Sequence, residues 1–187
     1  TVKANPITSV KNQFRSGTCW CFSTLGFLES EAIRLNNIKD TTLYPDFSEM
    51  FVVSHSYQDR AEKYVRLDGK LNFGAGSECN DVLYVAKHYG LVPQGVMPGL
   101  NYGTELPVHG EIDALASAYV KVIASNPNRV LSTAWKKGFQ GIMDAYFGEC
   151  PAEFTYNGVK YTPESYRDSY KINPDDYVSL TSYTHHP

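Results

Sequence analysis

The stretch Gln13-Phe-Arg-Ser-Gly-Thr-Cys19-Trp20 decides the fold, because it joins a polar, irregular segment to a strongly apolar helix. From Trp20 onwards, apolar residues recur at intervals of three and four, which is the period of an α-helix. Thr18 or Ser16 is a suitable N-cap for this helix, and Asn36-Asn37 is a suitable left-handed stop. Since the helix is apolar over a wide arc, we expect it to be central to the core.

The same stretch brings together the groups that a thiol nucleophile needs. Unpaired N–H groups and the dipole at a helix N-terminus favour a thiolate, so Cys19 is the candidate nucleophile. Gln13, six positions earlier, offers an amide that a turn could bring beside the thiol, and the backbone N–H of Cys19 could be the second oxyanion donor. Trp20 would shelter the site from water. Cys21 points away around the helix, which favours core packing over a redox or metal pair.

Downstream, helical periodicity alternates with turn signals. A glycine-rich loop at 73–77 separates two of the helices, Asn157-Gly158 predicts a tight hairpin within 154–161, and 177–183 alternates like a strand. The further helices are predicted from Ser48 to Asp68, from Glu78 to Gly90, near 108–125, near 128–147, and from Thr162-Pro163.

The composition describes an ordinary globular protein with 187 residues, of which 42% are hydrophobic and 20% charged. The net charge of −3 gives no reason to expect nucleic acid as a partner, and no apolar run is long enough to suggest a membrane partner. The four cysteines are expected to be free thiols, which suits a reducing, cytoplasmic location. No cofactor is implied. Because the chain begins with Thr1, we expect upstream residues to have been removed or omitted.

The Gln…Cys-Trp stretch resembles the active-site segment of papain-like cysteine peptidases. In its Arg-Ser-Gly-Thr-Cys-Trp form it is most similar to bleomycin hydrolases and bacterial aminopeptidase C, and Ser16 stands where papain has a disulfide-bonded cysteine. The resemblance covers most of the chain. It extends over Phe47-Ser48-Glu49, the 74–77 loop, Tyr89-Gly-Leu-Val-Pro93, the two-helix insertion and Asn173–Tyr183.

The resemblance implies an α+β, papain-like fold, represented here mainly by its helical N-terminal subdomain. Residues 1–99 would form that subdomain, 100–172 a helical insertion with a small hairpin, and 173–187 the truncated start of the second subdomain. The second, barrel-like half would be largely absent from this chain. We therefore expect the missing C-terminal half of the same protein to be a partner of the chain.

The resemblance also implies a cysteine-type peptidase, of aminopeptidase type, that cleaves peptide substrates through a Cys19 thioester. Gln13 would be the oxyanion donor, and Trp20 with Gly74 or Gly76 would line the substrate site. The resemblance also implies a homo-hexamer. The family needs a His and an Asn that this chain lacks, so the isolated chain should not hydrolyse peptides. The histidines of this chain do not occupy the position expected for the catalytic His. They are His55, His88, His109, His185 and His186.

Three alternatives stay open at this point. A non-catalytic papain-like binding or scaffold domain would not need Gln13, Cys19 and Trp20 together. A transglutaminase-like acyl transferase also begins a helix with its cysteine, but it does not explain the later segments. The third is an inactive fragment of the peptidase. No metal site is expected, because His185-His186 has no Cys or carboxylate at zinc-ligand spacing nearby, and a strand-end pair with one side chain buried is favoured.

Overall fold

The computed structural model describes residues 4–178 and 180, which are mostly helical with one two-stranded antiparallel sheet. His185 and His186 lie outside the described residues, as do 179 and 181–183 of the predicted final strand. The elements, in chain order, are α1 (Cys19–Asn36), the short 3₁₀ helix η1 (Thr41–Leu43), α2 (Glu49–Arg66), α3 (Cys79–Tyr89), α4 (Gly110–Ala124), α5 (Trp135–Phe147), β1 (Phe154–Tyr156), β2 (Val159–Tyr161), α6 (Pro163–Ser169) and the 3₁₀ helix η2 (Pro174–Asp176).

The ends of these elements follow the local chemistry of the sequence. Asn37 ends α1 in the left-handed conformation, with φ 51°. The Ser48 hydroxyl caps α2 by accepting a hydrogen bond from the Phe51 N–H at 3.1 Å. Thr162 and Ser165 form a reciprocal capping box at the start of α6. Asn157 and Gly158 both have positive φ, as a type I′ hairpin turn requires. The predicted starts and stops of α1, α2, α3 and the hairpin are therefore confirmed.

Two element predictions were wrong in part. Helix α5 begins at Trp135 rather than near 128, because the preceding segment is a loop with Arg129 at positive φ and the Asn126 side chain bonded to neighbouring backbone. Tyr177, Val178 and Leu180 are not in a strand, and the residues just before them form η2 instead. Among the described residues no strand lies beside this segment to pair with it, since the one sheet contains only β1 and β2.

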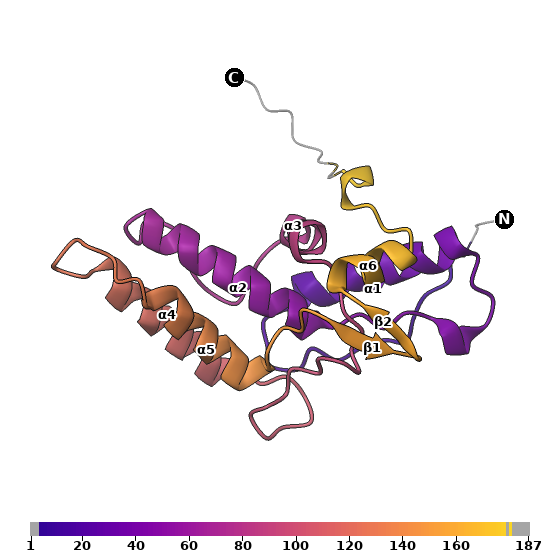
Figure 1. Ribbon diagram of the computed structural model, residues 1–187, viewed down its shortest axis with the longest axis horizontal. Helices are drawn as coiled ribbons and strands as arrows, with labels where there is room; N and C mark the ends of the chain where they lie inside the picture. Colours follow the sequence, from indigo (N-terminus) through magenta and orange to yellow (C-terminus); the bar gives the residue numbers. More distant parts are fainter. Residues whose placement is uncertain (1–3, 179, 181–187) are drawn as a thin grey trace.

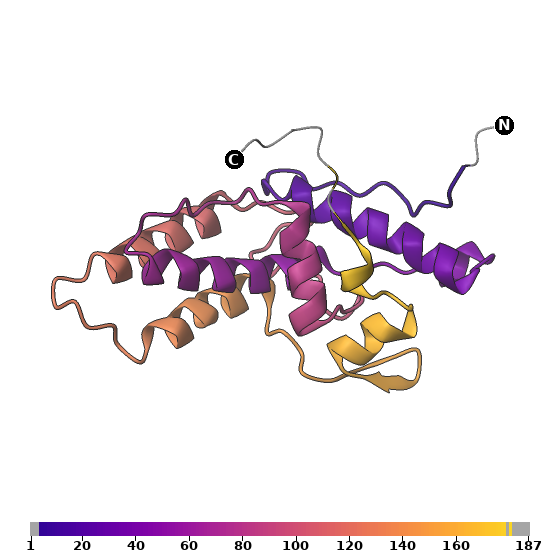
Figure 2. The same cartoon turned by 90° about the horizontal axis from the view of Figure 1, so that it is seen from above.

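Helix α2 is the central element, and it runs from the α4–α5 end of the molecule to its middle (Figure 1). Helices α4 and α5 pack along one part of α2 as a hairpin, and α3 crosses it on another side. Seen from above, α1 lies beside the start of α3. Helix α6 packs against α3, and the β-hairpin lies next to α6 (Figure 2). The fully buried large side chains come from α1, α2, α4, α5, α6 and the connecting loops: Leu25, Leu28, Ile33, Phe47, Met50, Phe51, Tyr57, Leu91, Ile112, Phe139, Phe147 and Tyr166.

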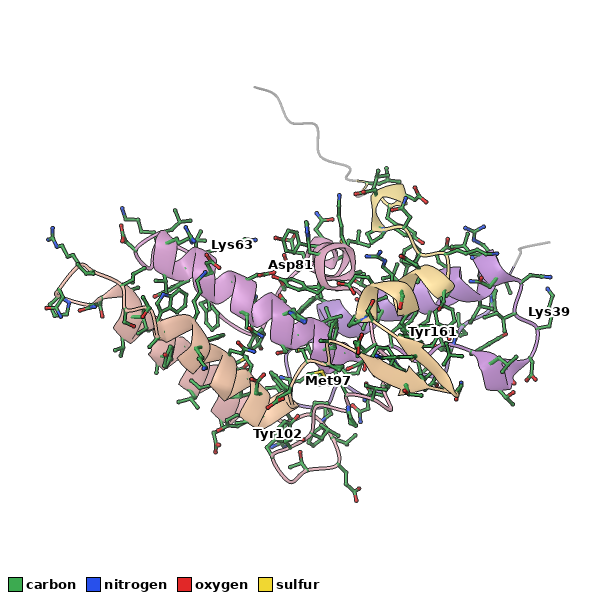
Figure 3. The ribbon with its side chains drawn as sticks, in the orientation of Figure 1. Lys39, Lys63, Asp81, Met97, Tyr102 and Tyr161 are labelled. Carbon is green, nitrogen blue, oxygen red and sulfur yellow. The ribbon has the colours of Figure 1, made fainter. Side chains whose placement is uncertain are left out.

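An aromatic cluster fixes the hairpin and α6 to the core. The Tyr166 ring packs edge-on against several aromatic neighbours, with centroid distances of 5.4 Å to Tyr161 and 6.1 Å to Phe47. Tyr161 lies between β2 and α6 (Figure 3). Edge-to-face pairs of this kind contribute about 0.5–1.5 kcal/mol each beyond the area they bury. Packing therefore accounts for the many tyrosines of this region.

An ion cluster centred on Lys11 fastens the N-terminal segment to the helices. The Lys11 ammonium lies 2.9 Å from Glu29 Oε1, 2.6 Å from Asp46 Oδ1 and 2.7 Å from Glu49 Oε1. Glu29 is fully buried, and its carboxylate also accepts the Phe47 N–H at 2.9 Å. Burial by itself lowers the pKa of Lys11, but the neighbouring carboxylates raise it above its ordinary value. A charged lysine thus holds the segment that leads to the candidate nucleophile.

Candidate active site

Cys19 is the first residue of α1, and its side chain is exposed. The two residues that follow it are buried: Trp20 is only 6% exposed, and Cys21 is fully inside the core. The first N–H groups of a helix, including that of Cys19, have no partner within the helix and are available to a ligand. The thiol therefore lies at the surface, at the positive end of a buried helix.

The chain turns between Gln13 and Cys19. Phe14 and Gly17 have φ of 47° and 65°, and the Phe14 N–H donates to Asn12 Oδ1 at 2.9 Å. Gln13 is half-buried at the start of this turn. We call residues 13–18 the nucleophile loop.

A segment from the beginning of the α4–α5 region holds the nucleophile loop in place. The Arg15 N–H donates to Pro107 O at 3.0 Å, and the His109 N–H donates to Arg15 O at 3.0 Å, so that Arg15 and Val108 form a parallel bridge. Ser16 and Thr18, on either side of Gly17, are buried, and their hydroxyl oxygens lie 2.5 Å apart. The Thr18 side chain is therefore used inside the loop and does not cap α1.

His109 is fully buried beneath this loop, and its ring meets those of Tyr102 and Phe147 at centroid distances of 6.1 and 5.2 Å. Tyr102 belongs to the loop below α5 in Figure 3. Burial lowers the pKa of His109 to about 4, and the nearby Ser16 backbone opposes this shift only in part. The imidazole is therefore neutral at physiological pH.

We expect His109 to make the protein sensitive to acid. An unfolded histidine has a pKa near 6.5, so the unfolded state takes up a proton first as the pH falls. The stability due to neutral His109 is complete above about pH 6.5 and is lost toward pH 4, by at most about 3 kcal/mol. Urea unfolding between pH 4 and 7 should show a shallower pH dependence in His109→Gln than in the wild type. Exposed His88, changed in the same way, is the control; equal slopes in both variants would contradict the expectation.

A second loop lies beside the start of α1. We call it the glycine loop and define it as residues 73–77. The Trp20 indole Nε1–H donates to Ala75 O at 3.0 Å. A Cβ atom on Gly17 would lie only 2.8 Å from Ala75 Cβ, so the nucleophile loop and the glycine loop are in contact. This contact lies where α1 and α3 begin side by side (Figure 2).

Gly74 and Gly76 have space beside them. A Cβ atom at either position would meet no atom within 4 Å, and neither glycine needs the left-handed conformation. Neither packing nor backbone conformation within the described residues therefore explains why these positions are glycine. Close approach of a bound molecule to the backbone is the other physical reason for glycine.

The structure thus brings Cys19, Trp20 and the loop with Gly74 and Gly76 to one place, with Gln13 at the start of the adjoining turn. Two further contributors were not predicted from the sequence. His109 fixes the nucleophile loop, and Arg60 binds the glycine loop through its guanidinium. Arg60 falls within the predicted second helix, in a run of polar residues, and its spacing does not mark it out.

None of the four cysteines, all of which lie in the described part of the chain, forms a disulfide, as expected, and their surroundings differ. Cys19 and Cys79 are exposed. Burial raises the pKa of Cys21 well above its ordinary value, and burial raises that of Cys150 to about 11. The prediction that Cys21 is a core residue is confirmed.

Within residues 4–178 and 180, no group of three or more His, Cys, Asp or Glu side chains is placed to hold a metal ion. Over the same part of the chain, no helix has the combined length and apolar character that crossing a membrane demands.

No protein-family model matches the chain, and no curated protein matches it. A solved structure shares its fold. This is the crystal structure of PepW from Lactobacillus rhamnosis HN001 (DR20), which matches with a TM-score of 0.56 and 20% sequence identity over 90% of this chain. The match covers 45% of the PepW chain, so the present chain spans less than half of that structure. The comparison establishes a likeness of fold, and the helices with a small sheet fit the α+β class.

Proposed function

We propose that this chain carries the nucleophile of a papain-like cysteine peptidase of the bleomycin hydrolase and aminopeptidase C type. The observation that carries the proposal is the exposed Cys19 at the first turn of a buried helix, with the glycine loop fastened beside it by Trp20. The structural neighbour supports it through its name, PepW, which suggests a peptidase. The sequence motif around Cys19 supplies the finer assignment to the family.

In the proposed reaction, the Cys19 thiolate attacks the carbonyl carbon of the scissile peptide bond. The new C–S bond places a negative charge on the carbonyl oxygen, which the Cys19 N–H and the Gln13 amide would stabilise. The C–N bond then breaks, and the amine leaves with a proton from a general acid. Water hydrolyses the resulting thioester to a carboxylic acid and restores the thiolate.

The general acid, a histidine, and the asparagine that orients it would come from the missing C-terminal half of the same protein. In this proposal, residues 1–99 are the nucleophile subdomain, 100–172 the insertion, and 173–187 the beginning of the second subdomain. Peptide substrates, a cytoplasmic location and a homo-hexamer belong to the same proposal. The substrate would lie in extended form along Gly74 and Gly76, whose open surroundings leave room for it.

Alkylation of the full-length protein tests this proposal. We expect iodoacetamide near neutral pH to modify Cys19 first, and hydrolysis of an aminoacyl-coumarin to stop in step with that modification. Cys21 and Cys150 should react far more slowly, because burial raises the pKa of both thiols and limits access to them.

Cys79 is the competing exposed thiol, so the experiment is repeated in Cys79→Ser. Peptide mapping by mass spectrometry assigns the label in both proteins. Modification confined to Cys79, with hydrolysis unaffected, would refute the role of Cys19. An unreactive Cys19 in a protein that hydrolyses no peptide would favour the scaffold alternative.

A further inference from the structure

Arg60 of α2 joins the glycine loop by two hydrogen bonds from one guanidinium. Its two terminal nitrogens donate to Gly74 O at 2.6 Å and to Gly76 O at 2.5 Å. The same group lies over the rings of Tyr57 and Phe73, with its central carbon 5.0 and 5.8 Å from the ring centroids. Arginine forms such a fork because its donors are fixed in one plane, and stacking on rings restrains that plane.

The surroundings of Arg60 fix its position from several sides. Burial lowers the pKa of Arg60, while Tyr57 and the carboxylates of Asp81 and Asp113 oppose this effect. Asp81 lies on α3 beside the middle of α2 (Figure 3), and Asp113 of α4 accepts a hydrogen bond from the Tyr57 hydroxyl at 2.7 Å. Arg60 is therefore half-buried, and charged groups of both α3 and α4 act on its guanidinium.

These contacts dictate how the peptide groups of the glycine loop are oriented. The carbonyls of Gly74 and Gly76 face Arg60, whereas the carbonyl between them, that of Ala75, faces Trp20. All peptide bonds of the described residues are trans, so each N–H points opposite to the carbonyl of the preceding residue. The N–H groups of Ala75 and Ser77 consequently point away from Arg60 and α2. Gly74 and Ala75 form a bend, so the loop is not a strand, but two of its carbonyls are directed at one guanidinium.

We infer that Arg60 is a positioning residue for substrate binding: it fixes the peptide groups of the glycine loop, so that the N–H groups of Ala75 and Ser77, which point away from α2, can donate to the backbone of a peptide. The inference rests on the proposed peptidase function and deepens it. Arg60 does not touch the reacting atoms. The nucleophile loop touches the glycine loop but has its own anchor, the backbone hydrogen bonds between Arg15 and the 107–109 segment, so loss of the fork should weaken substrate binding more than the chemical step.

Arg60→Lys tests this inference, because lysine keeps the charge and loses the fork. Arg66→Lys is the matched control: it is the same change on the same helix, at an exposed arginine paired with Glu62. In the full-length protein we expect R60K to raise KM for a dipeptidyl-coumarin by about tenfold, with kcat within about twofold of the wild type. R66K should leave both constants unchanged.

A second measurement reports on the loop without any need for hydrolysis. The Trp20 indole N–H donates to Ala75 O, so its hydrogen exchange, followed by NMR, should be faster by about tenfold or more in R60K than in R66K or the wild type. A third variant, Arg60→Gln, provides the same comparison if R60K does not fold.

The outcomes separate the two proposals. Faster indole exchange together with a raised KM supports the inference. Hydrolysis with an unchanged KM, or a fall in kcat alone, overturns it while leaving the peptidase function intact. If the wild type hydrolyses no peptide, the proposed function fails, and with it the role of Arg60 in substrate binding; the exchange measurement then decides only whether Arg60 orders the loop.

Discussion

Replacing Cys19 by alanine is expected to reduce peptide hydrolysis by the full-length protein to background, a loss of roughly 10⁴-fold or more in kcat. The reason is that no other exposed group in the described first turn of α1 can form the thioester. Substrate binding should persist, because the glycine loop and its contact with Trp20 do not involve the sulfur. Initial rates on an aminoacyl-coumarin measure the loss of hydrolysis. Titration of the variant with a fluorescent peptide measures substrate binding.

Two matched cysteine variants serve as controls. Cys21→Ala removes a thiol two positions along the same helix but inside the core, and Cys79→Ser removes the other exposed thiol. Both should keep kcat within about twofold of the wild type. Hydrolysis retained in Cys19→Ala, or lost equally in Cys79→Ser, would show that the nucleophile has been assigned to the wrong residue.

Replacing Lys11 by methionine is expected to destabilise the protein by about 3 kcal/mol, because it leaves the buried carboxylate of Glu29 without its cation. For a chain of this size, that change lowers Tm by roughly 6–12 °C. Chemical denaturation followed by circular dichroism measures the free energy of unfolding directly.

The comparison variant for this experiment is Lys87→Met. Lys87 also forms an ion pair, with Asp175 at 2.6 Å, but both side chains are largely exposed, so the loss should be within about 0.5 kcal/mol. Adding Glu29→Gln to Lys11→Met should recover part of the stability, since the uncompensated charge is removed. A Lys11→Met protein as stable as Lys87→Met would disprove the structural importance of the cluster.

The sequence was most informative where chemistry is local. Helical periodicity and capping residues such as Ser48 and Asn37 located α1 and α2, and the position of Cys19 at the start of its helix followed from the same pattern. The loop before α5 was missed because a helical spacing of apolar residues continues into it, and only the backbone contacts of Asn126 mark the break.

The contributors from distant parts of the chain could not be predicted in this way. Arg60 reaches the glycine loop from α2, the helix before it, and His109 meets Arg15 across more than ninety positions. Such contacts depend on how helices cross, and neither periodicity nor turn chemistry encodes a crossing. The roles assigned to Gln13, Trp20, Gly74 and Gly76 remain predictions, to which the structure adds the locations of these residues.

The parallel bridge between Arg15 and Val108 restricts how this protein can be shortened or recombined. The α4–α5 arm looks like an appendage that a designer would trim to obtain a minimal scaffold (Figure 1). Its root, however, supplies the backbone partners of Arg15, four residues before the thiol. A truncated version must therefore retain residues 107–109 or provide a substitute strand, and grafts of the cysteine segment onto other proteins must carry both pieces of chain.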